Sequence, residues 1–270
     1  MLKNNLRVLC PSTLAPTNFP ELVDIAAASG FGGLSLWYNG YEDARKQGMS
    51  DEEIKALASE KNLQIPMIEA VTQWLTGDAE AAKAEMDRLF TAGQAIGATS
   101  ACTVFLGPVI PKMEETVERF GQACDHAARF GISLALEFLP WSGIPDLATA
   151  WEIVKTADRP NGGILLDSWH WYRSGPNEEL LRSIPGNKIV CIQLNDASEQ
   201  AEENAMLDTM NNRLLLGDGD IDLKTLVTIL DEIGFQGPVA MEVFNKELKE
   251  KPPAEAAKLL GESLRSLLEA

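Results

Sequence analysis

The stretch from Ser133 to Asp167, SLALEFLPWSGIPDLATAWEIVKTADRPNGGILLD, contains one complete structural repeat of the chain. Apolar, β-prone residues fill Ser133–Phe138 and Gly163–Asp167, and the segment Pro145–Lys155 between them has the spacing of an amphipathic helix. A strand–helix–strand connection of this length joins parallel neighbours in one sheet. The stretch therefore predicts a β–α–β unit.

The same alternation of strand and helix patterns extends over the whole chain. Strand candidates lie at Leu6–Cys10, Gly33–Trp37, Gln64–Ile68, Ser100–Val104, Ser133–Phe138, Gly163–Asp167, Lys188–Leu194 and Pro238–Val243. Helical patterns lie at Phe19–Ser29, Asp51–Lys61, Asp78–Ile96, Glu114–Phe130, Pro145–Lys155, Asn177–Ser183 and Leu223–Ile233. Most strand candidates are separated by roughly 30 residues, the length of one β–α–β unit.

These repeats determine the expected fold class. Eight strand candidates in 270 residues match a (β/α)₈ TIM barrel, an α/β fold of roughly 250 residues. A doubly wound open sheet is the alternative, but no GxGxxG motif follows the first strand candidate. No linker or composition break divides the chain, so we expect a single barrel domain over residues 1–270.

Charge and cysteine content limit the partners and the compartment. The formal net charge of −17 argues against binding to nucleic acid or to an anionic membrane surface. The four cysteines lack paired metal-ligand spacing and fit a reduced compartment. No apolar stretch is long enough to span a bilayer, and MLKNNLRVLCPS at the N-terminus has too short an apolar run for a secretory signal. We therefore expect a cytoplasmic protein with a small-molecule partner.

Oxygen-bearing side chains close the last four strand candidates: Glu137, Asp167, Gln193 and Glu242. In barrels of this kind the C-terminal ends of the strands form the active site. Buried carboxylates are costly unless they are compensated, and a divalent cation compensates them most simply. An all-oxygen set favours Mg²⁺ or Mn²⁺ over Zn²⁺, with Co²⁺ as an alternative. Each carboxylate could instead cap a helix or pair with a base, but four on consecutive strands favour the metal site.

Motifs around these positions resemble a known family. The segments concerned are LEFLPW around Glu137, LLDSWHW around Asp167, Asp196-Ala197-Ser198 after Gln193, RLLLGDGDID from Arg213, and PVAMEVF around Glu242. Together they resemble the xylose-isomerase-like TIM barrels. That superfamily includes sugar-phosphate isomerases and epimerases, ketose 3-epimerases, inosose dehydratases and 3-dehydroshikimate dehydratases.

The resemblance implies a role for each matching residue. It makes metal ligands of Glu137, Asp167, Gln193 and Glu242. It also implies that His170 contacts a substrate oxygen near the metal and that Arg213 reaches the substrate. In the epimerase branch the two glutamates double as acid and base, so the implied catalytic residues are Glu137, Glu242 and His170. Members of the family are often dimers or tetramers, which implies a homo-oligomer.

Aromatic residues follow several strand candidates and predict the character of the binding site. Trp37 follows the second strand, Trp74 the third and Trp141 the fifth. Any one of them could be ordinary packing, but together they predict apolar walls suited to a sugar ring or another cyclic substrate. Few Lys or Arg residues occupy the expected mouth loops, so we expect an unphosphorylated keto-sugar, polyol or cyclic hydroxy-ketone.

The expected chemistry is proton abstraction next to a carbonyl, through an enediolate that a divalent ion stabilises. This predicts a metal-dependent isomerase or epimerase. Ketose epimerases carry histidine where this chain has Gln193, and glutamine resembles the 3-dehydroshikimate dehydratases. The close alternative is therefore a metal-dependent lyase acting by β-elimination, either a 3-dehydroshikimate or inosose dehydratase or an enzyme that cleaves an oxidised glycoside. A non-catalytic sugar-binding barrel is a third hypothesis. An endonuclease with a multi-zinc cluster is excluded, because the chain has two histidines and an acidic balance.

Overall fold

The computed structural model describes residues 2–75 and 77–269, and within them eight parallel strands close into a barrel. The strands are β1 (Arg7–Leu9), β2 (Gly33–Trp37), β3 (Gln64–Val71), β4 (Ser100–Val104), β5 (Ser133–Glu137), β6 (Gly162–Asp167), β7 (Ile189–Leu194) and β8 (Val239–Met241). Closure is direct, because β1 pairs in parallel with both β2 and β8. The predicted TIM barrel is confirmed.

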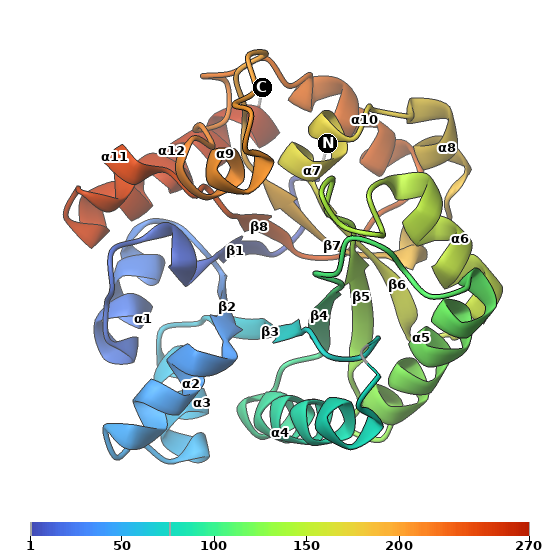
Figure 1. The fold of residues 1–270 in the computed structure, drawn as a ribbon. Coiled ribbons are helices and arrows are strands. Elements are labelled where there is room, and N and C mark those ends of the chain that lie inside the picture. Colours follow the sequence, from blue (N-terminus) through green and yellow to red (C-terminus); the bar gives the residue numbers. More distant parts are fainter. Residues whose placement is uncertain (1, 76, 270) are drawn as a thin grey trace.

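Helices surround the strands on the outside of the barrel (Figure 1). They are α1 (Phe19–Ala28), α2 (Tyr38–Lys46), α3 (Asp51–Glu60), α4 (Ala79–Ile96), α5 (Met113–Ala128), α6 (Leu147–Ala157), α7 (Ser168–Arg173), α8 (Glu178–Ser183), α9 (Ala205–Asn211), α10 (Leu223–Glu232), α11 (Lys246–Lys249) and α12 (Pro253–Glu269). Two short 3₁₀ helices, Pro11–Thr13 and Gly186–Lys188, complete the set in the described residues. No helix in the described part of the chain is long and apolar enough to cross a membrane.

The predicted strands and helices are all present, with ends shifted by a few residues. Helices α2, α7, α9, α11 and α12 are additional to the prediction. Helix α7 begins directly where β6 ends, because Asp167 closes the strand and also caps the helix. Helix α12 follows the last strand, whereas the expected helices all lie between strands.

Alternation along the strands separates two cores. Residues such as Leu134, Leu136, Ile164 and Leu166 face outward and pack in the large core that includes the helices. A second, smaller core consists of Val8, Met67, Cys102, Val104, Ala135, Leu139, Leu165, Cys191 and Ala240. Side chains two residues apart share one face of a strand, so the members of the small core face the barrel interior.

Glycine permits one close contact between the first and the last helix. A Cβ atom at Gly261 of α12 would collide with the carbonyl oxygen of Ser29, at the end of α1. This contact brings α12 against α1 beside the β1–β8 closure. Any larger residue must push the two helices apart.

We predict that Gly261→Ala lowers the free energy of unfolding by about 1–3 kcal/mol, because it overpacks a backbone contact. Gly40→Ala on α2 is the matched control, since its added Cβ would meet only Leu36 at an ordinary 3.4 Å. The control should be neutral or stabilising by up to about 1 kcal/mol. Urea unfolding of both variants measures the difference, and equal stabilities would contradict the proposed contact.

Candidate metal and substrate site

The barrel's alternation directs the four strand-end residues into its mouth. Glu137 lies two residues beyond interior Ala135, and Gln193 lies two beyond interior Cys191. Asp167 and Glu242 stand in the same relation to Leu165 and Ala240. All four side chains are buried, with exposed fractions between 0% and 8%.

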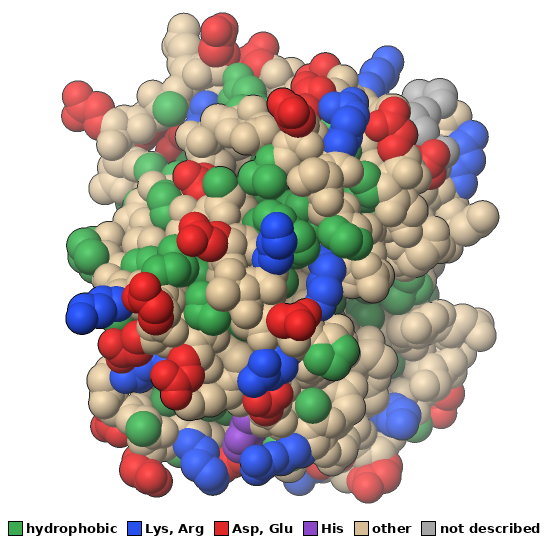
Figure 2. Space-filling model, turned by 90° about the vertical axis from the view of Figure 1, so that its right-hand side faces the viewer, with side chains coloured by type: hydrophobic (Ala, Val, Ile, Leu, Met, Phe, Trp, Pro, Cys, Tyr) green, Lys and Arg blue, Asp and Glu red, His purple; other side chains and the backbone are tan. Residues whose placement is uncertain are grey.

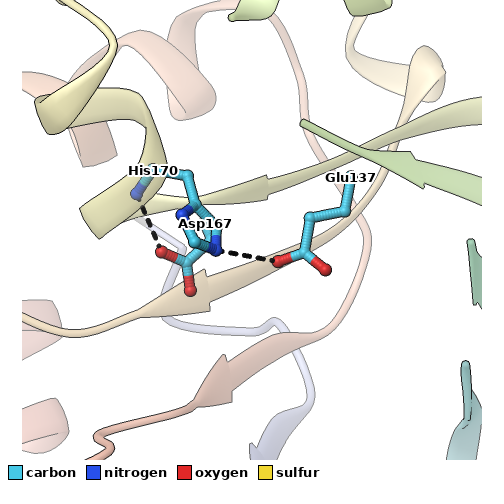
Figure 3. A group of neighbouring side chains, drawn as sticks. All are labelled: Glu137, Asp167 and His170. Carbon is cyan, nitrogen blue, oxygen red and sulfur yellow. Dashed lines mark hydrogen bonds and ion pairs between the residues drawn. The ribbon is translucent and has the colours of Figure 1, made fainter. Parts of the chain in front are cut away.

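Glu137, Asp167 and His170 lie together, with one candidate ligand atom from each within 4.8 Å of the others (Figure 3). Asp167 Oδ1 accepts hydrogen bonds from the backbone N–H groups of Trp169 (2.8 Å) and His170 (3.1 Å). This cap fixes the start of α7 and brings the imidazole to the mouth. His170 Nε2 then lies 3.5 Å from Glu137 Oε1. Burial lowers the pKa of His170 to about 3, so its ring is neutral near pH 7.

Arg213 supplies the countercharge of the cluster. Its Nη1 donates to Asp167 Oδ2 at 2.9 Å and to Glu242 Oε2 at 3.1 Å. Its Nη2 donates to Thr209 Oγ1 at 2.9 Å, and its guanidinium lies over the Phe244 ring, 4.6 Å from the centroid. The buried guanidinium thus joins two of the predicted metal ligands in the structure.

Gln193 links the cluster to a residue outside the predicted set, Glu69 at the mouth end of β3. The amide Nε2 donates to Glu242 Oε1 at 3.2 Å and to Glu69 Oε2 at 3.3 Å. Gln193 Oε1 and His170 Nδ1 are buried and have no hydrogen-bond partner in the described part of the chain. Glu69 lies two residues beyond interior Met67, so strand alternation is the sequence signal that identifies it.

Burial dominates the electrostatics of the carboxylates. It raises the pKa of Glu137 well above its usual range, and the neighbouring Glu242 and Asp167 add to this. It also raises the pKa of Glu242, against the opposing effect of Arg213. Burial, followed by the charge of Glu242, raises the pKa of Glu69 to about 8. Positive charge is therefore in short supply in the cluster, and a divalent cation fits this donor set.

Two buried thiols donate hydrogen bonds to the proposed catalytic glutamates. Cys10 Sγ donates to Glu242 Oε1 at 3.1 Å, and Cys102 Sγ donates to Glu137 Oε2 at 3.4 Å. Burial raises the pKa of both thiols well above the usual range, so they stay protonated and act as donors. Nothing in the cysteine spacing predicts these contacts; only the alternation of β1 and β4 places the thiols inside the barrel.

A cavity of about 370 Å³ opens above the cluster. Its polar lining includes Glu69, Glu137, His170, Arg213 and Glu242. Its apolar walls include Leu106, Leu139, Met206, Met210 and Phe244, two of them from α9. Among the described residues, Asp167 and Gln193 do not line this cavity but bond to residues that do. The cavity therefore combines a polar floor with hydrophobic walls.

The three tryptophans that the sequence predicts at the substrate site occupy different environments in the structure. Trp37 and Trp141 line the cavity, as expected for substrate contacts. Trp74 is buried elsewhere: its indole Nε1 donates to the Val104 carbonyl at 2.9 Å, and its ring meets Phe120 edge-on. Trp74 therefore packs beneath α5 and does not line this cavity, and its expected substrate contact stays a prediction.

Charges are intermixed on the surface drawn in Figure 2. Lys and Arg side chains are interspersed there with Asp and Glu rather than gathered into a basic patch. The expectation that the chain binds no nucleic acid rests on this distribution and on the net charge of −17, and it stays a prediction.

The closed barrel and its buried strand-end carboxylates define a TIM barrel with a candidate metal site at the C-terminal face. The chain belongs to the xylose isomerase-like TIM barrel family, whose model matches residues 23–269.

Curated relatives share part of their length with the chain. It is 24% identical over 255 residues to a 3-dehydroshikimate dehydratase of Pseudomonas putida, a match that covers 92% of the chain and 39% of the relative. It is 34% identical over 136 residues to an inosose isomerase of Bacillus subtilis, covering 50% of the chain and 48% of the relative. The matched stretches thus span less than half of either relative.

Solved structures show the same fold. A crystal structure of the IolI protein with a binding zinc atom superimposes with a TM-score of 0.89 at 21% identity, covering 98% of both chains. The probable 3-DHS dehydratase AsbF from Bacillus anthracis gives a TM-score of 0.79 at 19% identity, covering 96% of this chain and 98% of that one.

We predict that Arg213→Met destabilises the metal-free protein by about 3–5 kcal/mol, because it leaves buried Asp167 and Glu242 without their countercharge. Unfolding in EDTA and in Mn²⁺ measures the effect, and Mn²⁺ should restore much of the loss. Arg182→Met is the control, since its pairs with Glu178 and Glu232 lie at the surface, where solvent screens them, so this variant should be nearly as stable as the wild type. Similar stabilities for the two variants in EDTA would rule out this role for Arg213.

Proposed function

We propose that the chain is a divalent-metal-dependent enzyme of the sugar isomerase or epimerase type. It would remove the proton next to the carbonyl of an unphosphorylated keto-sugar, polyol or cyclic hydroxy-ketone. The observation that carries the proposal is the buried cluster of Glu137, His170 and Glu242 at the polar floor of an otherwise apolar cavity, with buried Asp167 beside it. The names of the relatives, an inosose isomerase and a 3-dehydroshikimate dehydratase, support the same substrate class.

The metal would be held by Glu137, Asp167, Gln193 and Glu242. The buried, unpartnered Gln193 Oε1 and the shortage of positive charge support this assignment. Mg²⁺ or Mn²⁺ suits the oxygen set, with Co²⁺ as an alternative. When bound, the cation supplies positive charge beside the substrate carbonyl oxygen, where negative charge develops as the proton leaves. Zn²⁺ stays a candidate because His170 Nε2 lies beside Glu137.

The chain's own residues would handle the proton and exclude water. Glu137 and Glu242 stand on β5 and at the end of β8, well apart around the barrel, so one carboxylate can accept the proton and the other return it. A thiol contact fixes one oxygen of each, and the second oxygen of Glu242 accepts from Arg213 while that of Glu137 lies beside His170. Neutral His170 can hydrogen-bond a substrate oxygen, and Trp37 and Trp141 would contact the apolar faces of the substrate ring.

A lyase using the same site is the second candidate. Gln193 in place of the histidine of ketose epimerases favours it, as does the dehydratase relative that matches 92% of the chain. Abstraction of the same proton would then be followed by loss of a β-hydroxyl. The four buried cysteines are free, which fits the cytoplasmic location that we propose.

Solvent exchange tests the proposal. The Mn²⁺-loaded protein incubated with an inosose in D₂O should incorporate deuterium next to the carbonyl, detected by NMR, and EDTA should abolish the exchange. A different result would favour the lyase over the isomerase: 3-dehydroshikimate would give a conjugated product that absorbs in the ultraviolet, and the inosose would incorporate no deuterium. Binding of either compound without conversion would favour a non-catalytic barrel.

We predict that Glu137→Gln lowers the exchange rate by about 10²–10⁴-fold, because it removes a carboxylate that can carry the proton. Glu118→Gln on the outer face of α5 is the control and should leave the rate unchanged. Mn²⁺ affinity, measured by calorimetry on both variants, separates loss of metal from loss of proton transfer. An unchanged rate in Glu137→Gln would overturn its catalytic assignment.

A further inference from the structure

Glu69 is a fourth buried carboxylate at the mouth, on β3 and separated from β6, β7 and β8 around the barrel. Its side chain lines the cavity and is 3% exposed as a residue. Its Oε2 accepts the Gln193 amide at 3.3 Å, whereas its Oε1 is buried with no hydrogen-bond partner within residues 2–75 and 77–269. An unpartnered oxygen in a cavity wall is costly, so it indicates a missing donor.

The first consequence concerns the orientation of Gln193. Its amide lies between Glu69 and Glu242, and its Nε2 donates to both carboxyl groups. The NH₂ end of the amide is thereby committed to these two residues, and Oε1 is left free on the other side. Glu69 therefore holds Gln193 with its oxygen available for a ligand.

The second consequence concerns what can enter the cavity. Arg213 is the one cationic side chain among the described residues that line it, and Asp167, Glu242 and Thr209 already occupy its guanidinium. An anionic group of a ligand would find no free cation there. Trp141 also lines the cavity, and its Nε1 is a buried donor without a partner in the described chain. Two residues that line the cavity thus carry an unpartnered acceptor on β3 and an unpartnered donor after β5, a pairing that suits hydroxyl groups.

We propose that Glu69 is a substrate-binding residue of this site. Its Oε1 accepts a hydrogen bond from a hydroxyl of an uncharged, polyhydroxylated cyclic ketone, while its Oε2 positions Gln193. The proposal rests on the proposed function above, and it narrows the substrate class to ketones without a carboxylate or phosphate.

Ser35 on β2 offers a competing explanation for the free oxygen. Its hydroxyl lies close enough to Glu69 to lower the pKa of that carboxyl as a hydrogen-bond donor does, yet by distance and angle neither Ser35 Oγ nor Glu69 Oε1 has a hydrogen-bond partner in the residues described. If Ser35 rather than a ligand satisfies Glu69, removing the hydroxyl should affect the site as strongly as changing Glu69 itself.

Two variants at one position separate the two roles. Glu69→Gln can still present its carbonyl oxygen to the Gln193 amide but turns an NH₂ group to the cavity. Glu69→Leu removes both contacts. We expect Glu69→Gln to keep Mn²⁺ affinity near wild type and to weaken inosose binding about 10- to 100-fold, because a buried substrate hydroxyl loses its acceptor. Glu69→Leu should weaken both Mn²⁺ and inosose binding.

Calorimetry measures Mn²⁺ alone and then inosose or 3-dehydroshikimate on the Mn²⁺-loaded proteins, with Ser35→Ala as control. Wild-type affinity for inosose in Glu69→Gln overturns the proposal, as does tighter binding of 3-dehydroshikimate than of inosose to the wild type. A loss in Ser35→Ala equal to that in Glu69→Gln assigns the oxygen to Ser35. Binding of neither compound to the wild type instead overturns the proposed function. If Glu69→Leu does not fold, the isosteric Glu69→Gln carries the test.

Discussion

The two-residue alternation of a strand inside a closed barrel controls what this molecule can do. A barrel interior has room for few side chains, and here small or slender residues such as Ala135, Cys191 and Ala240 fill it. The next inward position on each strand lies at the mouth, where the interior widens. Polar residues at those positions must face one another, because the opposite face of each strand is committed to the helices.

Because the inward polar residues face one another, several buried carboxylates lie close together and need hydrogen-bond donors or positive charge nearby. Buried carboxylates gather from β3, β5, β6 and the end of β8, and the described site answers them with the guanidinium of Arg213 and the neutral donors of Gln193, Cys10 and Cys102. These donors occupy both oxygens of Glu242, whereas Glu69 Oε1 and Gln193 Oε1 keep no partner in the described chain. The arrangement is rigid at the floor and incomplete above it, as expected of a site that binds a cation and an oxygen-rich ligand.

Much of this could be predicted from the sequence, for a physical reason. The repeated β–α–β pattern determines a parallel barrel, and the strand ends place Glu137, Asp167, Gln193 and Glu242 at one mouth. Contacts within the cluster could not be predicted, because they depend on side-chain directions that no spacing records. Arg213 was expected to reach a substrate, and the structure also gives it the role of countercharge.

The positions of aromatic residues after the strands were the least reliable predictor of which residues line the cavity. A tryptophan shortly after a strand can turn inward or outward, and Trp74 turns outward into the packing beneath α5. Alternation was the stronger signal and, applied to β3, it identifies Glu69 without any structure. The thiols follow the same rule on β1 and β4, although cysteine alone indicates no contact with a glutamate.

The segment that supplies Arg213 also supplies a wall of the cavity. Thr209, which holds the guanidinium, lies on α9 beside Met206 and Met210, which line the cavity. A cation bound beside Asp167 and Glu242 would share these carboxylates with Arg213, which Thr209 still holds, and any shift of the guanidinium would be passed on to this helix. Metal-free and metal-loaded preparations would then present differently shaped cavities to a compound library, so the state of loading decides which ligands a screen can find.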